Sequence, residues 1–471
     1  MKTPLYTALA QHAEKKPYSF HVPGHHNGDV FFDEARTYYD SILQLDVTEL
    51  EGLDDLHHPT GVIQEAEHLL AKLYGSDQSF FLVNGTTVGN LAMVMAACRA
   101  GDEIFVQRNC HKSVYHAIEL AGATPILIEA EIDPHLYVPT HVTDETVKKA
   151  ISKHPNCRAI VLTYPNYYGH AADLSKLIDM CHEAGMIVLV DEAHGAHFVL
   201  GGAFPPSALS YGADVVVQSA HKTLPAMTMG SYLHLQGERM DAKRLKTFLT
   251  MLQSSSPSYP IMASLDVARA YVEEIKKKEI LDGIMKELAE LKNEFNRIPQ
   301  LEVIESELLS NDPLKCVIRS TKGLTGYELK RVLESVEVHP ELADEHQVLL
   351  IFGLEQKKDI PFKQIEQALN QSDSLLKLKG KDHFQREAPA NDNDEHRQDI
   401  EAVPFEHAAG RVSAESVIPY PPGIPLIVKG ERIEIDQIAA LSRLLGHQVH
   451  VQASQVIHQR KLYVYIEEET L

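Results

Sequence analysis

Short apolar runs alternate with helix-like stretches between about residues 70 and 235. The runs have the length of strands, whereas Thr87–Cys98 carries its apolar residues at helical spacing. We expect six strands: Ser79–Val83, Glu103–Gln107, Thr124–Ile128, Ala159–Thr163, Ile187–Asp191 and Val215–Gln218. Such alternation is typical of an α/β fold with a mainly parallel sheet covered by helices.

The pattern changes after Met262, where the chain becomes helical and charged as far as Asn296. Short apolar runs around 316–320 and 348–352 then predict a small α+β domain. Residues 377–402 contain few large apolar residues and predict a linker, after which apolar patterning returns. The expected organisation is an N-terminal arm at 1–30, a large domain at 31–260, a small domain at 261–376, a linker at 377–402 and a C-terminal domain at 403–471.

Composition narrows the classes of protein to consider. The longest apolar runs are far shorter than the roughly 20 residues that a membrane helix needs. A formal net charge of −22 disfavours nonspecific binding to nucleic acid or anionic membranes and favours the approach of small cations. The five cysteines form no CxxC pair, the histidines show no metal-ligand spacing and the N-terminus shows no secretory pattern. We therefore expect a cytoplasmic protein without a metal site.

Reactive side chains follow two of the expected strands. In IVLVDEAHGAHF the apolar strand ends in Asp191, Glu192 and His194. In VVVQSAHKTL it ends in Ser219, His221 and Lys222. The carboxyl ends of parallel strands share one sheet edge, where open α/β folds bind ligands. A lysine just past a buried strand can become the neutral amine that attacks carbonyls, and a neighbouring aspartate suits a pyridinium nitrogen. Each residue alone is equally typical of a solvated strand end, but the pair favours a site.

A third stretch, FFLVNGTTVGN, predicts a strand, a tight turn and a helix. Gly85 permits the sharp turn, and Thr86, Thr87 and the free N–H groups of the helix start suit a phosphate. An ordinary threonine N-cap is the alternative for this stretch.

These motifs together resemble a known family. In chain order they read LDVTELEGLDDLHHPTG, FFLVNGTTVGN, RNCHKS, VDEAHGAH, QSAHKTL, MLQSSSPSY and PYPPGIP. The set resembles the fold type I pyridoxal-phosphate (PLP) dependent Orn/Lys/Arg decarboxylases, above all the short bacterial arginine or lysine decarboxylases. It runs from Pro4 to about residue 435 and is weakest between 275 and 400. The resemblance implies a fold type I PLP-dependent transferase-like large domain, a small α+β domain and a C-terminal decarboxylase domain.

The resemblance also implies roles around the cofactor ring. Lys222 would hold PLP as a Schiff base, and Asp191 would pair with the pyridine nitrogen. His111 in RNCHKS would stack on one face of the ring, and His194 would lie near the reacting carbon. All four are expected catalytic residues.

Other roles concern the phosphate and the oligomer. The implied phosphate ligands within one chain are Thr86, Thr87, Ser219 and His221. Relatives are dimers, and Ser254 matches the position that reaches the phosphate of the partner subunit. The chain would thus form a homodimer or a higher homo-oligomer with shared active sites.

The implied activity is decarboxylation of a basic L-amino acid, arginine first and lysine or ornithine next, feeding polyamine metabolism. His26 and Lys429 depart from the family's usual lysine and proline, which affects the arm and the C-terminal domain. An aminotransferase or lyase of the same fold would use the same Asp191 and Lys222. Arg319 and Arg331 are the weak candidates for an aminotransferase's carboxylate-binding arginine. A noncatalytic PLP-binding protein is a further alternative.

Overall fold

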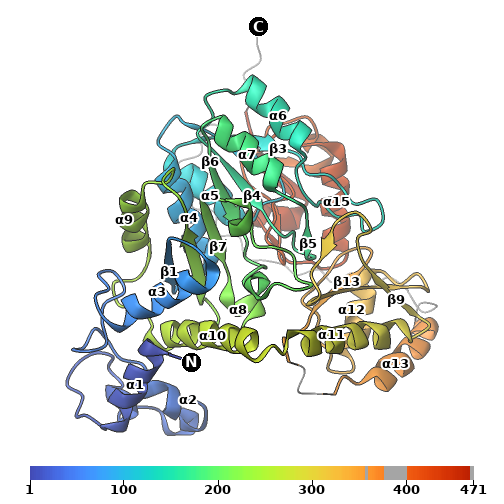
Figure 1. Ribbon diagram of the computed structural model, residues 1–471. Coiled ribbons are helices and arrows are strands. Elements are labelled where there is room, and N and C mark those ends of the chain that lie inside the picture. Colours follow the sequence, from blue (N-terminus) through green and yellow to red (C-terminus); the bar gives the residue numbers. More distant parts are fainter. Residues whose placement is uncertain (356–358, 376–399, 467–471) are drawn as a thin grey trace. The chain divides into compact units, whose positions relative to one another are not determined.

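The computed structural model describes residues 1–355, 359–375 and 400–466 (Figure 1). The chain forms two compact units. The first comprises Met1–Arg297, Leu301–Ile318 and Leu349–Ile360, and the second comprises Ile298–Gln300, Arg319–Val348 and Pro361–Leu471. Most of the predicted linker lies outside the described residues. The five domain boundaries expected from the sequence stay a prediction.

A seven-stranded sheet in the order β1-β8-β7-β6-β4-β2-β3 is the centre of the first unit. Its strands are β1 (Gln78–Leu82), β2 (Glu103–Gln107), β3 (Thr124–Ile128), β4 (Ala159–Thr163), β6 (Ile187–Asp191), β7 (Val215–Gln218) and β8 (Ser231–Leu235). Strand β8 runs antiparallel to β1 and β7, while β3, β2, β4, β6 and β7 pair in parallel. The expected α/β fold with a mainly parallel sheet is confirmed. The six expected strands form, and β8 is a strand that the sequence pattern missed.

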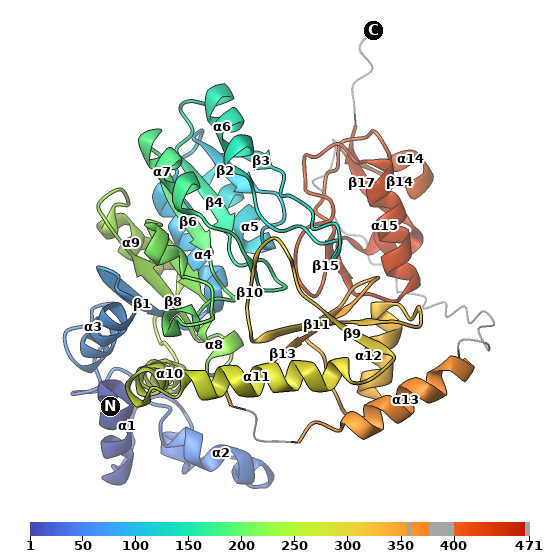
Figure 2. The ribbon, with the colours of Figure 1, turned by 45° about the vertical axis from the view of Figure 1, so that its right-hand side comes forward.

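Helices cover this sheet on both sides (Figures 1 and 2). They are α3 (Val62–Tyr74), α4 (Gly85–Ala97), α5 (Lys112–Ala121), α6 (Asp144–Lys153), α7 (Ser175–Glu183), α8 (Ala220–Thr223) and α9 (Ala242–Leu252). Ile187 and Leu189 of β6 share a core cluster with α4, α5 and α9. Every residue of β6 is buried, because helices cover both faces of the sheet. A strand in this position needs apolar side chains on both faces.

Further elements complete the first unit. Helix α1 (Pro4–Glu14) is tied to α10 (Tyr259–Lys278) by the carboxylate of Asp266, which accepts the backbone N–H of Leu5 at 3.0 Å. Helices α10 and α11 (Leu281–Asn296) follow one another end to end in both views (Figures 1 and 2). The remaining elements are α2 (Arg36–Leu43), β5 (His170–Ala171), β9 (Leu301–Ile304) and β10 (Ser310–Asn311), with β10 paired to β5.

Strands β11 (Lys315–Ser320) and β13 (Val348–Ile351) form where short strands were expected, and the boundary between the units falls within each of them. The elements that follow are α12 (Gly326–Glu334), β12 (Leu342–Ala343), α13 (Phe362–Leu375), β14 (Ile400–Pro404), α14 (Phe405–Ala408), β15 (Ile418–Pro419), α15 (Ile435–Gly446), β16 (Val451–Gln452) and β17 (Lys461–Tyr465). Antiparallel pairing of β14 with β17 and a separate apolar cluster hold the C-terminal part together.

Gly89 in α4 gives a test of how tightly this helix packs on the sheet, and Gly283 in α11 gives the control. A Cβ atom at Gly89 would lie 2.5 Å from Cγ1 of Val217 and 2.9 Å from Cδ1 of Leu82, so Gly89→Ala must push α4 away from the strands. We expect a loss of about 1–3 kcal/mol of stability. Gly283→Ala in α11 meets no atom within 4 Å and should gain about 0.5–1 kcal/mol from helix propensity.

Calorimetric melting of the two variants checks this packing. A melting temperature of Gly89→Ala at or above that of the wild type would contradict the close approach of α4 to β7.

Candidate active site

Asp191 ends strand β6 as a buried carboxylate with defined partners. Its Oδ2 accepts a hydrogen bond from Nδ2 of Asn90 in α4 at 2.8 Å, and its Oδ1 accepts the backbone N–H of Ala193 at 3.1 Å. Asp191 is only 4% exposed. A buried carboxylate held in this way is oriented for a cationic or N–H partner.

The side-chain amide of Asn90 also determines, through Ser113, which ring nitrogen of His111 carries the proton. Its Nδ2 also donates to Oγ of Ser113 at 2.9 Å, and this hydroxyl lies 2.8 Å from Nδ1 of His111. Nδ1 also accepts the backbone N–H of Ser113, so the ring proton belongs on Nε2. Burial, with a contribution from Lys222, lowers the pKa of His111 to about 4. The ring is therefore neutral near pH 7.

Lys222 lies in the short helix α8, directly after β7. Its Nζ is 3.2 Å from Nε2 of His194, which comes from the loop after β6. Nδ1 of the same ring is 2.9 Å from Nζ of Lys315, and the ring of Tyr167 lies 4.4 Å away between centroids. Burial, followed by Lys222 and Lys315, lowers the pKa of His194 well below its ordinary value. The structure thus brings Lys222 and His194 within hydrogen-bonding distance.

We call the following residues the Lys222 cluster: Asn90, His111, Ser113, Tyr167, Asp191, His194, Lys222 and Lys315. Hydroxyl groups and a helix start beside this cluster suit an anion. Oγ1 of Thr86 lies 3.1 Å from Oγ of Ser219, which joins the first turn of α4 to the end of β7. Gly85 has a positive φ of 73°, as the tight turn before this helix requires. Thr87 is exposed, and Nδ1 of His221 lies 3.0 Å from the carbonyl of Gly230. This set of donors fits a phosphate group.

Comparisons with known proteins identify the family. The model for the Orn/Lys/Arg decarboxylase major domain matches residues 3–308, and that for the Orn/Lys/Arg decarboxylase C-terminal domain matches residues 381–449. The chain belongs to the Orn/Lys/Arg decarboxylase family. The expected amino acid decarboxylase is confirmed, and the family implies PLP as cofactor.

Several relatives share nearly the whole length. The chain is 52% identical to the Bacillus subtilis protein named Uncharacterized protein YaaO, over all of both chains. It is 35% identical to the Arginine decarboxylase of the same species, over 96% of each. The solved Escherichia coli constitutive lysine decarboxylase superposes with a TM-score of 0.81 at 18% identity, covering 99% of this chain and 82% of that one. This last likeness shows the shared fold.

Ser254 stands apart from the other expected site residues of this decarboxylase. Its side chain is exposed, its hydroxyl contacts Ser256, and its carbonyl lies 2.8 Å from Nε2 of His57. Within the described residues, the hydrogen bonds of Ser254 go to Ser256 and His57 and not to the Lys222 cluster. Its expected role toward a partner subunit remains a proposal.

Four residues of the cluster escaped the sequence analysis: Asn90, Ser113, Tyr167 and Lys315. Asn90 follows Thr86 by four residues, so one helical turn separates them on the same face, and this spacing was a usable signal. Lys315 lies more than ninety residues after Lys222, in the stretch where the family resemblance is weakest. No local pattern marks it.

Glu192 next to Asp191 has a structural environment. It is fully buried and accepts hydrogen bonds from Oγ of Ser207, from the backbone N–H of Ala208 and from Nε2 of Gln218. Burial raises its pKa to about 8 despite these donors. Glu192 thus anchors the strand end that presents Asp191.

Two features are absent from the part of the chain that the structure describes. No helix there is both long and apolar enough to cross a membrane. In the same ranges, no three His, Cys, Asp or Glu side chains converge as metal ligands.

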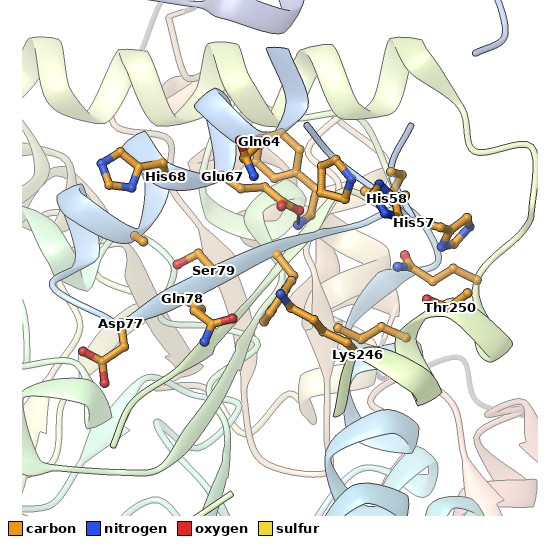
Figure 3. Close-up of a pocket in the computed structure, with 17 residues that line it drawn as sticks. His57, His58, Gln64, Glu67, His68, Asp77, Gln78, Ser79, Lys246 and Thr250 are labelled. Atoms are coloured by element: carbon orange, nitrogen blue, oxygen red, sulfur yellow. Dashed lines mark hydrogen bonds between the residues drawn. The ribbon is translucent and has the colours of Figure 1, made fainter. Parts of the chain in front are cut away.

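A separate cavity of about 440 Å³ lies between α3, β1 and α9, and none of its lining residues belongs to the Lys222 cluster. In Figure 3, strand β1 passes between the side chains of Glu67 and Lys246. Oε1 of Glu67 accepts the backbone N–H of Phe81 at 2.9 Å. Burial raises the pKa of Glu67 to about 8, while the Phe81 N–H and Lys246 oppose the rise. Glu67 is thus largely protonated near pH 7.

The raised pKa of Glu67 predicts a pH-dependent loss of stability. Between about pH 4.5 and pH 8 the folded chain holds a proton that the unfolded chain releases, so the free energy of unfolding falls as pH rises. Between these two pH values the free energy of unfolding falls by up to about 1.4 kcal/mol per pH unit. Glu67→Gln keeps the shape and the Phe81 bond without titrating, so its melting temperature should gain on the wild type as pH rises from 5 to 8.

Glu65→Gln is the matched control, because Glu65 is an exposed carboxylate on the same helix that pairs with Lys2. Its melting curve should follow the wild type's pH dependence. A constant difference between Glu67→Gln and wild type across this range would contradict the buried, protonated state of Glu67.

Proposed function

We propose that this decarboxylase removes the α-carboxylate of a basic L-amino acid, arginine first and lysine or ornithine next, with PLP attached to Lys222. The observation that carries the proposal lies at the carboxyl edge of one parallel sheet, where Lys222 contacts His194, and where both Lys222 and Asp191 act on His111. The amine, the acid that would pair with the pyridine nitrogen and a neutral imidazole stand in one cluster. This is the set of groups that such a reaction needs.

Each of these residues has a task that its environment supports. Bound PLP supplies an electron sink for the pair left on the α carbon when CO2 leaves. Asp191, held by Asn90, would keep the pyridine nitrogen protonated. His111, neutral and fixed as the Nε2–H tautomer, would lie flat on the ring without adding charge. Lys222 and His194, whose Nζ and Nε2 lie 3.2 Å apart, would be the groups that return a proton to the α carbon.

The phosphate would be held between the start of α4 and the end of β7. The proposed ligands are Thr86, Thr87, Ser219 and His221. The hydroxyls of Thr86 and Ser219 already lie 3.1 Å apart at the start of the 13-residue helix α4. Helix N-termini favour phosphates because their N–H groups and dipole both face the anion.

The relatives favour arginine among the basic substrates, and the net charge favours a basic substrate in general. Four arginine decarboxylases are 34–35% identical to this chain over more than nine-tenths of its length, whereas the lysine decarboxylase LdcA of Pseudomonas aeruginosa is 25% identical. The net charge of −22 favours the approach of a cationic side chain. The amine product would feed polyamine metabolism.

We also propose a homodimer in which Ser254 of one chain reaches the phosphate site of the other. Large exposed aromatic side chains near the N-terminus support a contact with a second subunit, since Tyr18 and Phe20 of the arm are more than 90% exposed and Tyr38 in α2 is 88% exposed. Burial of these aromatic side chains against a second subunit would remove their apolar surface from water.

The cytoplasm is the proposed location of the enzyme. All five cysteines are free and buried, which suits a reducing compartment.

The substrate assignment predicts a defined pattern of CO2 release. The purified chain supplied with PLP should release CO2 from arginine fastest, with lysine and ornithine next and leucine at least a hundredfold slower, because a pocket built for a charged tail loses that interaction with leucine. Labelled CO2 and the resolved amine products are the measurements.

Asp191→Asn has the same size but cannot keep the pyridine nitrogen protonated, so it should lose most of the turnover.

Equal rates for leucine and arginine would contradict the basic substrate. Near-normal turnover by Asp191→Asn would contradict the role of that carboxylate.

A further inference from the structure

The cavity between α3, β1 and α9 also takes part of its wall from the LDDLHHPTG stretch (Figure 3). Residues 56–59 of this stretch line it. Its volume of about 440 Å³ lies within the range of small-molecule sites. The proposed decarboxylation uses none of the lining residues, so the cavity needs an explanation of its own.

The carboxylate of Asp54 fixes the wall that residues 56–59 provide. Its Oδ1 accepts the backbone N–H of Thr60 at 2.9 Å, and its Oδ2 accepts that of Gly61 at 2.8 Å. The hydroxyl of Tyr259 in α10 donates to the carbonyl of Asp54. These bonds hold the segment that leads into α3 in one conformation. The wall is therefore formed before any ligand arrives, as is usual for small-molecule sites.

Two buried side chains cap the open edge of strand β1, which is an edge strand of the sheet. Oε1 of Glu67 accepts the N–H of Phe81 at 2.9 Å, and Oε1 of Gln253 accepts the N–H of Val83 at 2.9 Å. Glu67 and Gln253 are at most 8% exposed, and both line the cavity. Each side chain therefore has one further polar atom, Oε2 of Glu67 and Nε2 of Gln253, for another partner.

These two polar atoms are hydrogen-bond donors without a protein acceptor. Within the described residues neither Oε2 of Glu67 nor Nε2 of Gln253 makes a hydrogen bond, and both remain accessible to water. An amide nitrogen has two N–H groups. A protonated Glu67 carries its proton on Oε2, because Oε1 accepts from Phe81. A ligand that displaces water here must supply acceptor atoms, since an unpaired buried donor costs free energy.

A positive charge faces the same space. Lys246 is the one lysine or arginine among the described residues that line the cavity, and its Nζ lies 5.5 Å from the centre of the Phe80 ring. Burial raises the pKa of Glu67 to about 8 against the opposing effects of the Phe81 N–H and Lys246. The lysine is thus near enough to act on this carboxyl group. Asp77 lies apart from both in Figure 3, and its carboxylate accepts the N–H of Gly237 at 2.8 Å.

The remaining walls are largely apolar. Leu56, Ala71, Phe80 and Leu249 line the cavity. Apolar walls with a few placed polar groups are the usual composition of sites for small organic molecules. An organic acid can bury its apolar body against such walls, whereas an inorganic ion gains nothing from them.

We propose that this cavity binds a small organic carboxylate. The O–H of Glu67 and Nε2 of Gln253 would donate to the ligand's acceptor atoms, and Lys246 would balance its charge. The apolar body would lie against Phe80 and Leu249. A hydrogen bond to a carboxylate is roughly twice as strong as one between neutral groups. This site does not depend on the proposed decarboxylation.

Benzoate is the probe, because it joins a carboxylate to a compact apolar ring. Calorimetric titration of the full-length, PLP-loaded chain with benzoate at pH 7 should show saturable binding. Benzamide has the same ring without the charge and should bind about tenfold more weakly or worse. Benzylamine carries the opposite charge and should show no binding in the same concentration range.

Lys246→Met locates the bound benzoate. It should weaken benzoate binding by about tenfold or more, because a hydrogen bond or ion pair to a charged group is lost. Its affinity for benzamide should stay the same. Lys243→Met is the matched control, since Lys243 is an exposed lysine of the same helix outside the lining and its loss changes the net charge equally. Benzoate bound at the Lys222 cluster would not respond to Lys246→Met.

The pH dependence of binding gives a second readout. Between pH 7 and pH 9 Glu67 loses the proton that it would donate, so the wild-type affinity for benzoate should fall by about tenfold. Glu67→Gln offers an N–H at every pH and should remove this part of the fall. The other charged or titratable groups that face the cavity or act on Glu67 are Asp54, His57, His58, His68, Asp77 and Lys246. They are present in both proteins, so the difference isolates Glu67.

Absence of saturable benzoate binding would overturn the proposal, and so would an equal loss of affinity in Lys246→Met and Lys243→Met. Tighter binding of benzylamine than of benzoate would overturn the anionic class of ligand. An identical fall with pH in wild type and Glu67→Gln would overturn the donor role of Glu67. If Glu67→Gln does not fold, the comparison of the two lysine variants still decides. A chain without decarboxylase activity would lose the proposed function and leave these measurements standing.

Discussion

The parallel pairing of β6 with β7 is the constraint on which the site depends. Leu189 pairs with Val215 and Asp191 with Val217, so the two strands end side by side. The contact continues past the strands, because the N–H of Glu192 donates to the carbonyl of Val217 and that of Ser219 to the carbonyl of Ala193. A slip of one residue would turn every side chain of a strand to the opposite face and separate Asp191 from the Lys222 segment. Such a slip is opposed because it would break the hydrogen bonds that the buried carboxylate of Asp191 accepts from Asn90 and Ala193.

Burial also determines the charges in the site. Burial lowers the pKa of the imidazole rings of His111 and His194, and it raises the pKa of the Glu192 carboxyl group. Water is replaced by fixed partners such as Asn90 and Lys315. The result is a set of neutral rings and one oriented carboxylate, which is the environment in which an electron-withdrawing cofactor can act.

The sequence predicted the parts of this structure that local patterns encode. Apolar runs marked β6 and β7, and the polar residues after them pointed to Asp191 and Lys222. The strand β8 was missed because its sequence SYLHL begins with Ser231 and contains His234, which interrupt the apolar run. Lys315 was missed for a different reason. Its contact with His194 spans 121 residues of sequence, and only the fold brings the two together.

The most direct test of the account is to find which lysine carries the cofactor. The purified chain is loaded with PLP, reduced with borohydride to fix the pyridoxal group to the lysine nitrogen, digested and mapped by mass spectrometry. The account predicts the label on Lys222 and its loss in Lys222→Ala. A label on another lysine of the neighbourhood, such as Lys112 or Lys315, in the wild-type chain would contradict it.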